Sequence, residues 1–409
     1  MIVVALGGCG GMGRHAVRTA LEFDEVDQIL IADRDKSRAA EFARSCGDKT
    51  APWQIDVTDS KSLAKLLDLG DVVLNTVGPF YQLGVPILKT AIETGCNYLD
   101  VNDDWEPTLE MLKLHDAANS VGVTAVIGMG ASPGISNLLA AKACARLDEV
   151  DEIVTGWGLG DEAEELASPD GRLSAAMVHW MHQCSGMIRV FRNGHLVNTS
   201  PLEEVKLQYP GVAAATGWTL GHPEPATLSR LRPELSSSVN VMVMPDSVMD
   251  MVRWASEEIN HGHISVQDAA AVLQGLPPDS AGGHKLPNAF AVPLLFRRAW
   301  TRIKGLVGRK KSRRKSDMPE LFALAMGRKD GEEQTVGASI TSAPAGGMGG
   351  ATGVPLAVGL KMLIEGQIRA TGVHPPETCI DPDAFFDALA PLCTPPLEDS
   401  RSLVSIATA

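Results

Sequence analysis

Short apolar runs alternate with amphipathic stretches along the first third of the 409-residue chain. The apolar runs are typical of strands, and the stretches between them repeat apolar residues at helical spacing. The pattern predicts strands at 2–6, 28–32, 53–57, 71–77, 97–101 and 123–127. It predicts helices at 14–21, 36–46, 60–67, 86–95 and 106–120. Strands joined by helical crossovers indicate an α/β fold with a doubly wound parallel (Rossmann) sheet.

The pattern changes beyond residue 135, where a long helix over 135–146 is followed by strand-like stretches. These lie at 151–159, 188–197, 238–244 and 333–341, as in a mixed α+β domain. A last helical pattern at 354–368 is expected to return to the first domain. We therefore predict a dinucleotide-binding domain at 1–130, an inserted substrate and dimerisation domain at 131–345, a returning helical segment at 346–393 and a poorly ordered tail at 394–409.

A glycine-rich turn joins the first predicted strand to the first predicted helix. Within it, Gly8 permits a tight turn, Gly10 lets the backbone approach a pyrophosphate, and Gly13 lets the helix pack on the strand. Asp33 lies 20 residues beyond Gly13, at the end of the second strand, where such folds place the acid that binds the ribose. We predict NAD or NADP as cofactor. Asp33 mildly favours NAD, and the neighbouring Arg34 weakens that preference.

Open parallel sheets bind their ligands at the carboxyl ends of the strands, so the residues after each strand are candidates. After the fourth predicted strand, Gly78-Pro79 forms an edge with few side chains where a nicotinamide would fit. Asp100 and Asp103 offer carboxylates beyond the next strand, although helix capping by Asp103 or Asp104 is an equally good explanation. The predicted cofactor-binding residues are Gly8, Gly10, Gly11, Met12, Gly13, Asp33, Arg34, Asp56, Val57, Asn75, Val77, Gly78 and Pro79.

The order of these motifs resembles the saccharopine dehydrogenase family along nearly the whole chain. The resemblance rests on 8–13, 32–35, 56–59, 75–79, 98–100, 130–137, 221–230 and 352–355. It implies hydride transfer between a nicotinamide and a carbon–nitrogen bond of an amino acid or polyamine conjugate. It also implies a homodimer. Saccharopine reductases carry an aspartate where this chain has Ser132, so the substrate stays open.

Chemistry of this kind requires an imine carbon held against the nicotinamide and a group that moves the proton of the nitrogen. The candidate catalytic residues are Asp100, Asp103 and His222. The candidate substrate-binding residues are Tyr81, Ser132, Pro133, Gly134, Glu224 and Arg230, although an arginine such as Arg230 more often forms surface salt bridges. The alternative is a non-catalytic dinucleotide-binding protein, peripheral at a membrane.

Composition narrows these possibilities. A net charge of −14 argues against nucleic acid as a partner. The seven cysteines include no C-x-x-C pair, which suits a reducing compartment, and the N-terminus lacks the basic region of a secretory signal, so we expect a cytoplasmic protein. His179 and His182 have no second ligand cluster in the sequence, so a helix surface is favoured there and no metal is predicted.

The stretch 294–315 is not explained by catalysis. Its apolar residues recur at helical spacing opposite arginines and a lysine, and a basic run follows at 309–315. Such a pattern suits either an interfacial anchor for anionic lipid or a helix packed on its own domain, and the second is the commoner case.

Overall fold

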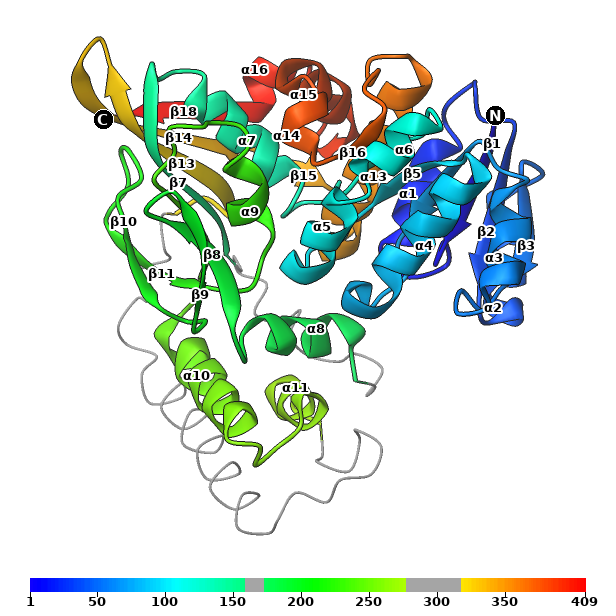
Figure 1. Cartoon of the computed structure of the whole chain (residues 1–409), viewed down its shortest axis with the longest axis horizontal. Coiled ribbons are helices and arrows are strands. Elements are labelled where there is room, and N and C mark those ends of the chain that lie inside the picture. Colours follow the sequence, from blue (N-terminus) through cyan, green and yellow to red (C-terminus); the bar gives the residue numbers. More distant parts are fainter. Residues whose placement is uncertain (159–172, 277–317) are drawn as a thin grey trace.

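The computed structural model of the chain describes residues 1–158, 173–276 and 318–409. Its first sheet is parallel and seven-stranded, in the order β16-β6-β5-β4-β1-β2-β3 (Figure 1). The strands are β1 (Ile2–Leu6), β2 (Gln28–Asp33), β3 (Thr50–Gln54), β4 (Val72–Asn75), β5 (Asn97–Asp100), β6 (Thr124–Val126) and β16 (Gly372–His374). The predicted parallel α/β fold is confirmed, and β16 adds a strand that the sequence pattern did not reveal.

Helices cover this sheet, and most begin where the sequence predicts. They are α1 (Gly13–Ala20), α2 (Lys36–Cys46), α3 (Ser60–Leu67), α4 (Phe80–Thr94), α5 (Trp105–Leu112) and α6 (His115–Ser120). The side chains of Asp35 and Asp59 cap α2 and α3 by accepting backbone N–H bonds. α4 begins at Phe80, before the expected start, and keeps Pro86 inside it. The stretch predicted as one helix over 106–120 is divided into α5 and α6.

The second sheet has nine strands, and β10-β11-β12-β7-β13-β14-β18 form its main path. Its strands are β7 (Glu149–Gly158), β8 (Ile188–Arg192), β9 (His195–Thr199), β10 (Glu204–Leu207), β11 (Ala215–Thr219), β12 (Ser237–Val243), β13 (Leu321–Lys329), β14 (Glu332–Ile340) and β18 (Val404–Thr408). The stretch predicted as one strand over 188–197 is a hairpin, because Asn193 and Gly194 both take positive φ and turn the chain.

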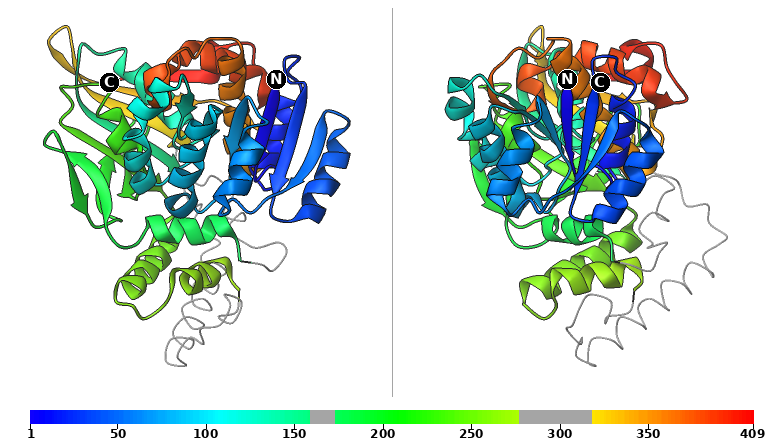
Figure 2. Two further views of the ribbon diagram at one scale, coloured as in Figure 1. Left: turned by 45° about the vertical axis from the view of Figure 1, so that its right-hand side comes forward. Right: turned by 90° about the vertical axis from the view of Figure 1, so that its right-hand side faces the viewer.

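Three helices lie beneath the two sheets: α8 (Ala175–Gln183), α10 (Asp246–Asn260) and α11 (Val266–Gln274) (Figures 1 and 2). They share an apolar cluster that includes Met181, Trp218 and Val252. Two further helices follow loops that shape the site, namely α7 (Ile135–Cys144) and the short α9 (Glu224–Leu228). The second part of the chain is therefore mixed α+β, as its sequence pattern predicts.

The apolar helix α13 (Gly347–Ile364) packs tightly on α1. A Cβ added at Gly353 would lie 2.2 Å from the Met12 carbonyl oxygen, and one at Gly349 would lie 2.8 Å from that of Gly11. Glycines are needed at this contact because the two backbones nearly touch. In length and composition α13 also passes as a membrane-crossing helix, but 61% of its apolar window is buried inside the protein, as in the core helix of a globular domain.

The expectation of a poorly ordered tail after residue 393 is wrong. After β15 (Ala343–Pro344), α14 (Pro376–Cys379) and α15 (Pro382–Leu389), the chain forms β17 (Cys393–Thr394), α16 (Ser400–Leu403) and β18. β18 pairs antiparallel with β14, from Val404 opposite Ile340 to Thr408 opposite Val336. A strand this short gains its order from the edge it joins, and that edge is not visible in its own sequence. The basic stretch 294–315 lies outside the described residues.

Candidate active site

The glycine turn between β1 and α1 has the geometry of a dinucleotide cradle. The Gly10 N–H donates to the Gly7 carbonyl at 2.8 Å, which closes a tight turn. A Cβ added at Gly13 would lie 2.3 Å from the same carbonyl oxygen, so the helix start tolerates only glycine there. At Gly11, in contrast, an added Cβ meets nothing within 4 Å. The backbone thus packs tightly on its inner side and leaves open space at Gly11, as a bound pyrophosphate requires.

Asp33 at the end of β2 lies beside this turn. Its carboxylate accepts a hydrogen bond from the Cys9 thiol at 2.9 Å and one from the Asp35 backbone N–H at 3.0 Å. Burial and Asp33 raise the pKa of the Cys9 thiol to about 12, which keeps it a donor. The guanidinium groups of Arg14 and Arg38 donate to the Cys9 carbonyl at 3.1 and 3.4 Å. A carboxylate and two cations therefore lie together around Cys9, at the end of β2 where such folds bind the ribose.

The other predicted cofactor residues follow strands of the same sheet edge. The side-chain amide oxygen of Asn75, Oδ1, accepts the Val77 backbone N–H at 3.0 Å, which fixes the path of the chain toward Gly78 and Pro79. Asp56 and Val57 come after β3, where the Asp56 carboxylate accepts the Thr58 hydroxyl at 2.7 Å. Positions after β1, β2, β3 and β4 thus line one edge, where parallel sheets bind ligands.

Asp100, a predicted catalytic residue, is fully buried. Its carboxylate accepts the Tyr98 hydroxyl and the Gly128 N–H, both at 2.7 Å, and the Asn102 N–H at 3.1 Å. Burial raises its pKa to about 6. A carboxylate held by three donors and closed to solvent fixes the loops after β5 and β6, so the geometry favours a structural role over the predicted catalytic one.

Asp103 lies in a charged cluster with His179 of α8. His179 Nε2 is 2.9 Å from Asp103 Oδ1 and 3.5 Å from Asp104 Oδ1. Burial alone would lower the pKa of His179, but the two carboxylates raise it to about 9. Burial opposes ionisation of Asp103, yet the His179 charge and hydrogen bond hold its pKa below the usual value. Asp103 and His179 are therefore an ion pair at neutral pH, and His179 carries a proton.

His179 does not lie on an exposed helix surface, and the prediction from the sequence is wrong on this point. Its side chain is only 19% exposed and bridges two parts of the molecule that are far apart in sequence. Its nitrogen and the Asp103 and Asp104 oxygens lie within 4.8 Å of one another, a spacing that a metal ion would also accept. The short ion pair already uses these atoms. No local signal identifies His179, because its partners are supplied by the loop before α5.

A second buried cluster joins His222 to Glu224 at the start of α9. His222 Nδ1 lies 3.3 Å from Glu224 Oε2. Glu224 Oε1 accepts bonds from the hydroxyls of Ser132 and Ser136 and, at 3.0 Å, from the Asn240 amide. Burial disfavours both charges, but the charge of Glu224 raises the pKa of His222, and the charge of His222 lowers that of Glu224. The two side chains form a buried ion pair.

These groups do not form a hydrolytic triad, although they include a serine, a histidine and an acid. Ser132 donates to Glu224, and it approaches the same His222 nitrogen, Nδ1, that faces the carboxylate. A triad instead uses the two imidazole nitrogens separately. Pro133 follows the serine and has no N–H for an oxyanion hole. The cluster therefore positions the 130–134 loop and holds charge.

The 130–134 loop is also tied to the C-terminal segment. Gly134 takes φ +122°, and its N–H donates to the Asn137 side chain at 3.0 Å. The Asn137 amide in turn donates to Glu377 of α14 at 2.9 Å. Burial raises the pKa of Glu377 to about 7. Asn137 and Glu377 were not predicted from the sequence, because their roles depend on contacts between distant segments.

Two predicted substrate residues are placed very differently. Tyr81 stacks on His182 with ring centroids 4.6 Å apart, and its backbone N–H donates to Asp104 at 3.2 Å. Tyr81 therefore borders the Asp103–His179 cluster. Arg230, two residues beyond the end of α9, is exposed and forms no ion pair with any described residue. The structure does not bring it to either buried cluster.

Comparisons with known proteins agree with the geometry of the cradle. Residues 3–126 match the family model described as the saccharopine dehydrogenase NADP binding domain. This part of the chain is thus similar to the cofactor-binding domain of the saccharopine dehydrogenase family. Both the resemblance predicted from the motifs and the assignment of NAD or NADP as cofactor are confirmed. The match covers β1 to β6 of the first sheet and none of the second sheet.

Individual relatives extend the likeness to different lengths. A carboxyaminopropylagmatine dehydrogenase of Synechocystis is 22% identical over 97% of both chains. A probable mitochondrial saccharopine dehydrogenase-like oxidoreductase of Arabidopsis thaliana is 28% identical, but over only 31% of each chain. The apo structure of the L-glutamate-forming saccharopine dehydrogenase of Saccharomyces cerevisiae has a TM-score of 0.61 and 17% identity, with 100% of this chain and 99% of that one covered. This last comparison confirms the fold.

Proposed function

We propose that the protein transfers a hydride between NADP(H) and a carbon–nitrogen bond of an amino acid or polyamine conjugate. The observation that carries the proposal is the Asp103–His179 ion pair, which stands just beyond β5, at the cofactor edge of the first sheet. The names of relatives support the substrate class: one is a carboxyaminopropylagmatine dehydrogenase and another a carboxynorspermidine synthase. The homodimer and the cytoplasmic location stay predictions.

In the reductive direction an amine and a carbonyl compound lose water and form an imine. Bound NADPH would supply a hydride to the imine carbon, and the nitrogen must gain a proton. His179 is protonated because its pKa is raised to about 9, and Asp103 holds the ring at Nε2, 2.9 Å away, so the proton on Nδ1 is the one that the ring would give to the nitrogen. In the oxidative direction the neutral imidazole would accept the proton. One group therefore serves both directions.

The His222–Glu224 pair has a different part in this proposal. It is almost closed to solvent, with His222 4% exposed and Glu224 0% exposed. The pair contacts the 130–134 loop through Ser132, which donates to Glu224. The positive charge of His222 also helps to keep Asp103 ionised. We assign proton transfer to His179 and Asp103, and electrostatic positioning to His222 and Glu224.

Turnover of purified full-length protein tests the proposal. We expect NADPH to be oxidised only when an amine and a 2-oxo acid or aldehyde are both present. Basic amino acids and polyamines should be paired with pyruvate, 2-oxoglutarate and aspartate semialdehyde. The control reaction contains the carbonyl compound without amine. Tight NADPH binding together with no turnover for any pair would contradict the proposal and support the non-catalytic alternative.

A further inference from the structure

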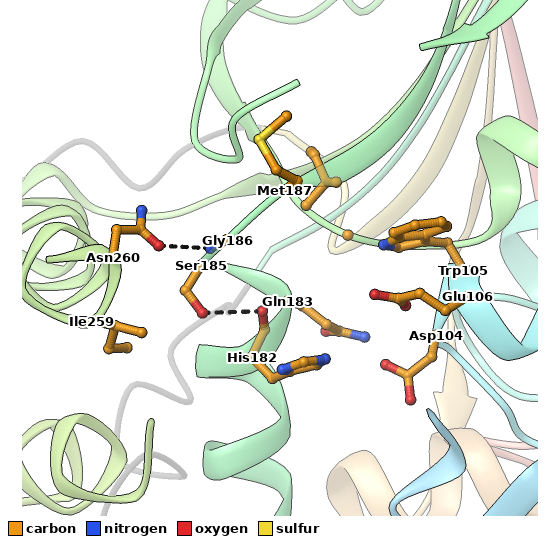
Figure 3. Close-up of a pocket in the computed structure, with 12 residues that line it drawn as sticks. Asp104, Trp105, Glu106, His182, Gln183, Ser185, Gly186, Met187, Ile259 and Asn260 are labelled. Carbon is orange, nitrogen blue, oxygen red and sulfur yellow. Dashed lines mark hydrogen bonds between the residues drawn. The ribbon is translucent and has the colours of Figure 1, made fainter. Parts of the chain in front are cut away.

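A cavity of about 340 Å³ adjoins the Asp103–His179 pair. Four segments that are distant in sequence build it: the start of α5 with Asp104 before it, the end of α8 with the chain that follows to Ile188, Gly221, and the end of α10 (Figure 3). Its polar and aromatic lining residues are Asp104, Trp105, Glu106, His182, Gln183, Ser185 and Asn260. Because Asp104 also lies 3.5 Å from His179 Nε2, the cavity and the proton-carrying group share one side chain.

The wall of the cavity carries negative charge. The carboxylates of Asp104 and Glu106 point toward His182 and Gln183 across the cavity (Figure 3). Burial, followed by the nearby His179 charge, lowers the pKa of His182, so this imidazole is neutral at pH 7. Among the described residues that line the cavity there is no lysine or arginine. The lining therefore offers two carboxylates and no cation of its own.

The charges around Asp104 are not balanced within the described residues. Asp104 is 1% exposed, and its nearest cationic group is His179, which lies closer to Asp103, at 2.9 Å against 3.5 Å. Glu106 forms no ion pair within the described part of the chain. The imidazolium of His179 thus faces the carboxylates of Asp103, Asp104 and Glu106, while His222, which also acts on Asp103, is paired with Glu224. A buried carboxylate without its own counter-charge is costly, and burial raises the pKa of Asp104 to about 7.

The Trp105 ring adds an aromatic surface to this wall. Aromatic faces attract cations, and guanidinium groups also stack on them. Arg189 already lies over the Trp105 ring, with 5.5 Å between its guanidinium carbon and the ring centroid, but Arg189 does not line the cavity. The Trp105 ring therefore contacts the Arg189 guanidinium and also lines the acidic cavity.

We propose that this cavity binds the cationic end, an ammonium or guanidinium group, of the amine substrate. The inference rests on the proposed function and narrows its substrate class to amines with a second positive charge. Asp104 and Glu106 supply the opposite charge, and the Gln183 and Asn260 side chains add polar atoms to the wall. A neutral or acidic group at that end would leave the carboxylates uncompensated, so the cavity selects against it.

Calorimetric titration of the full-length protein tests the cavity without any turnover. The probes are butylguanidinium, butylammonium and the neutral isostere butylurea, each added with and without NADPH. We expect at least one of the two cations to bind about tenfold or more tighter than butylurea. The Glu106→Gln and Asp104→Asn variants should each lose most of that difference. Glu110→Gln is the matched control, because Glu110 lies exposed on the same helix, paired with Lys113, and does not line the cavity.

Proton release provides a second readout. If a cation binds beside Asp104, it favours the ionised carboxylate, so binding at pH 7 should release protons and binding well above pH 8 should not. Titration in buffers of different ionisation enthalpy measures this release. The inference is wrong if neither cation binds better than butylurea, or if both cavity variants bind the cations as the wild type does. Because no hydride transfer is measured, these outcomes are separate from failure of the proposed activity.

Discussion

The glycine cradle for the cofactor and the Asp103–His179 cluster are built from different parts of the polypeptide. The cradle is built from backbone, and its defining residues, Gly10 and Gly13, matter because they lack side chains. The cluster is built from side chains, and its geometry comes from Asp103 and His179, which are 76 positions apart. The cradle therefore depends on local conformation, whereas the cluster depends on how two parts of the molecule pack together.

This difference predicts distinct consequences for substitution. A change in the cradle should act through sterics, be insensitive to pH and reduce cofactor affinity. A change in the cluster should act through charge and proton transfer, vary with pH and leave cofactor affinity intact. The predictions that follow test this division, in order of decreasing effect.

The largest effect is expected from Gly13→Val. Even the first added carbon would lie 2.3 Å from the Gly7 carbonyl oxygen, so the turn must open and NADPH affinity should fall at least about a thousandfold, or about 4 kcal/mol. The matched control is Gly11→Ala, whose added carbon meets nothing within 4 Å. Fluorescence titration with NADPH measures both variants. Equal affinities for the two would show that close packing does not shape the cradle.

Asp103→Asn is the corresponding change in the cluster. It keeps the shape but removes the charge that orients and ionises His179, so kcat should fall at least about a hundredfold with little change in NADPH affinity. Asp116→Asn, on the surface of α6, is the control and should behave as wild type. Steady-state kinetics with separate cofactor titrations measure the effect. A rise in KM with unchanged kcat would assign Asp103 to substrate binding instead.

The cluster should also make stability depend on pH. The pKa of His179 is raised in the folded protein to about 9, above the ordinary histidine value of 6.5. Its contribution to the free energy of unfolding is therefore fully present below pH 6.5 and disappears as pH rises through 9, a loss of at most about 3 kcal/mol. Denaturant unfolding at pH 6 and pH 9.5 measures it. His179→Gln should flatten this difference, and an unchanged difference would mean that other groups cause it.

The smallest effect concerns the choice of cofactor. The Asp33 carboxylate would repel the 2′-phosphate of NADPH. The guanidinium groups of Arg14 and Arg38 would attract that phosphate, and both lie close to Asp33 because all three side chains contact Cys9. Asp33→Asn should therefore strengthen NADPH binding relative to NADH by roughly tenfold, or about 1.4 kcal/mol. Parallel titrations with the two cofactors measure the ratio. A ratio that does not move would show that the carboxylate does not face the ribose 2′-position.

The difference between local conformation and contacts between distant segments also explains which features the sequence could predict. The parallel sheet, helices α2 and α3, and the glycine turn were predicted correctly, because each depends on local periodicity, on a cap such as Asp35 or on a local motif. Asp103 and His222 were chosen as chemical candidates, but their partners were not identified. His179 and Glu377 gain their environment only after distant segments meet. For the same reason β16 and β18, whose order comes from neighbouring strands, were missed.

The C-terminal region completes both sheets, and this affects how the chain folds during synthesis. β16 extends the first sheet beside β6, and β18 extends the second beside β14. Both strands leave the ribosome after every other strand of the sheet that they complete. Until then β6 and β14 present unpaired edges, which attract other chains. We therefore expect nascent chains that stop before residue 372 to need chaperones, and full-length chains to become resistant to aggregation only once synthesis has passed residue 408.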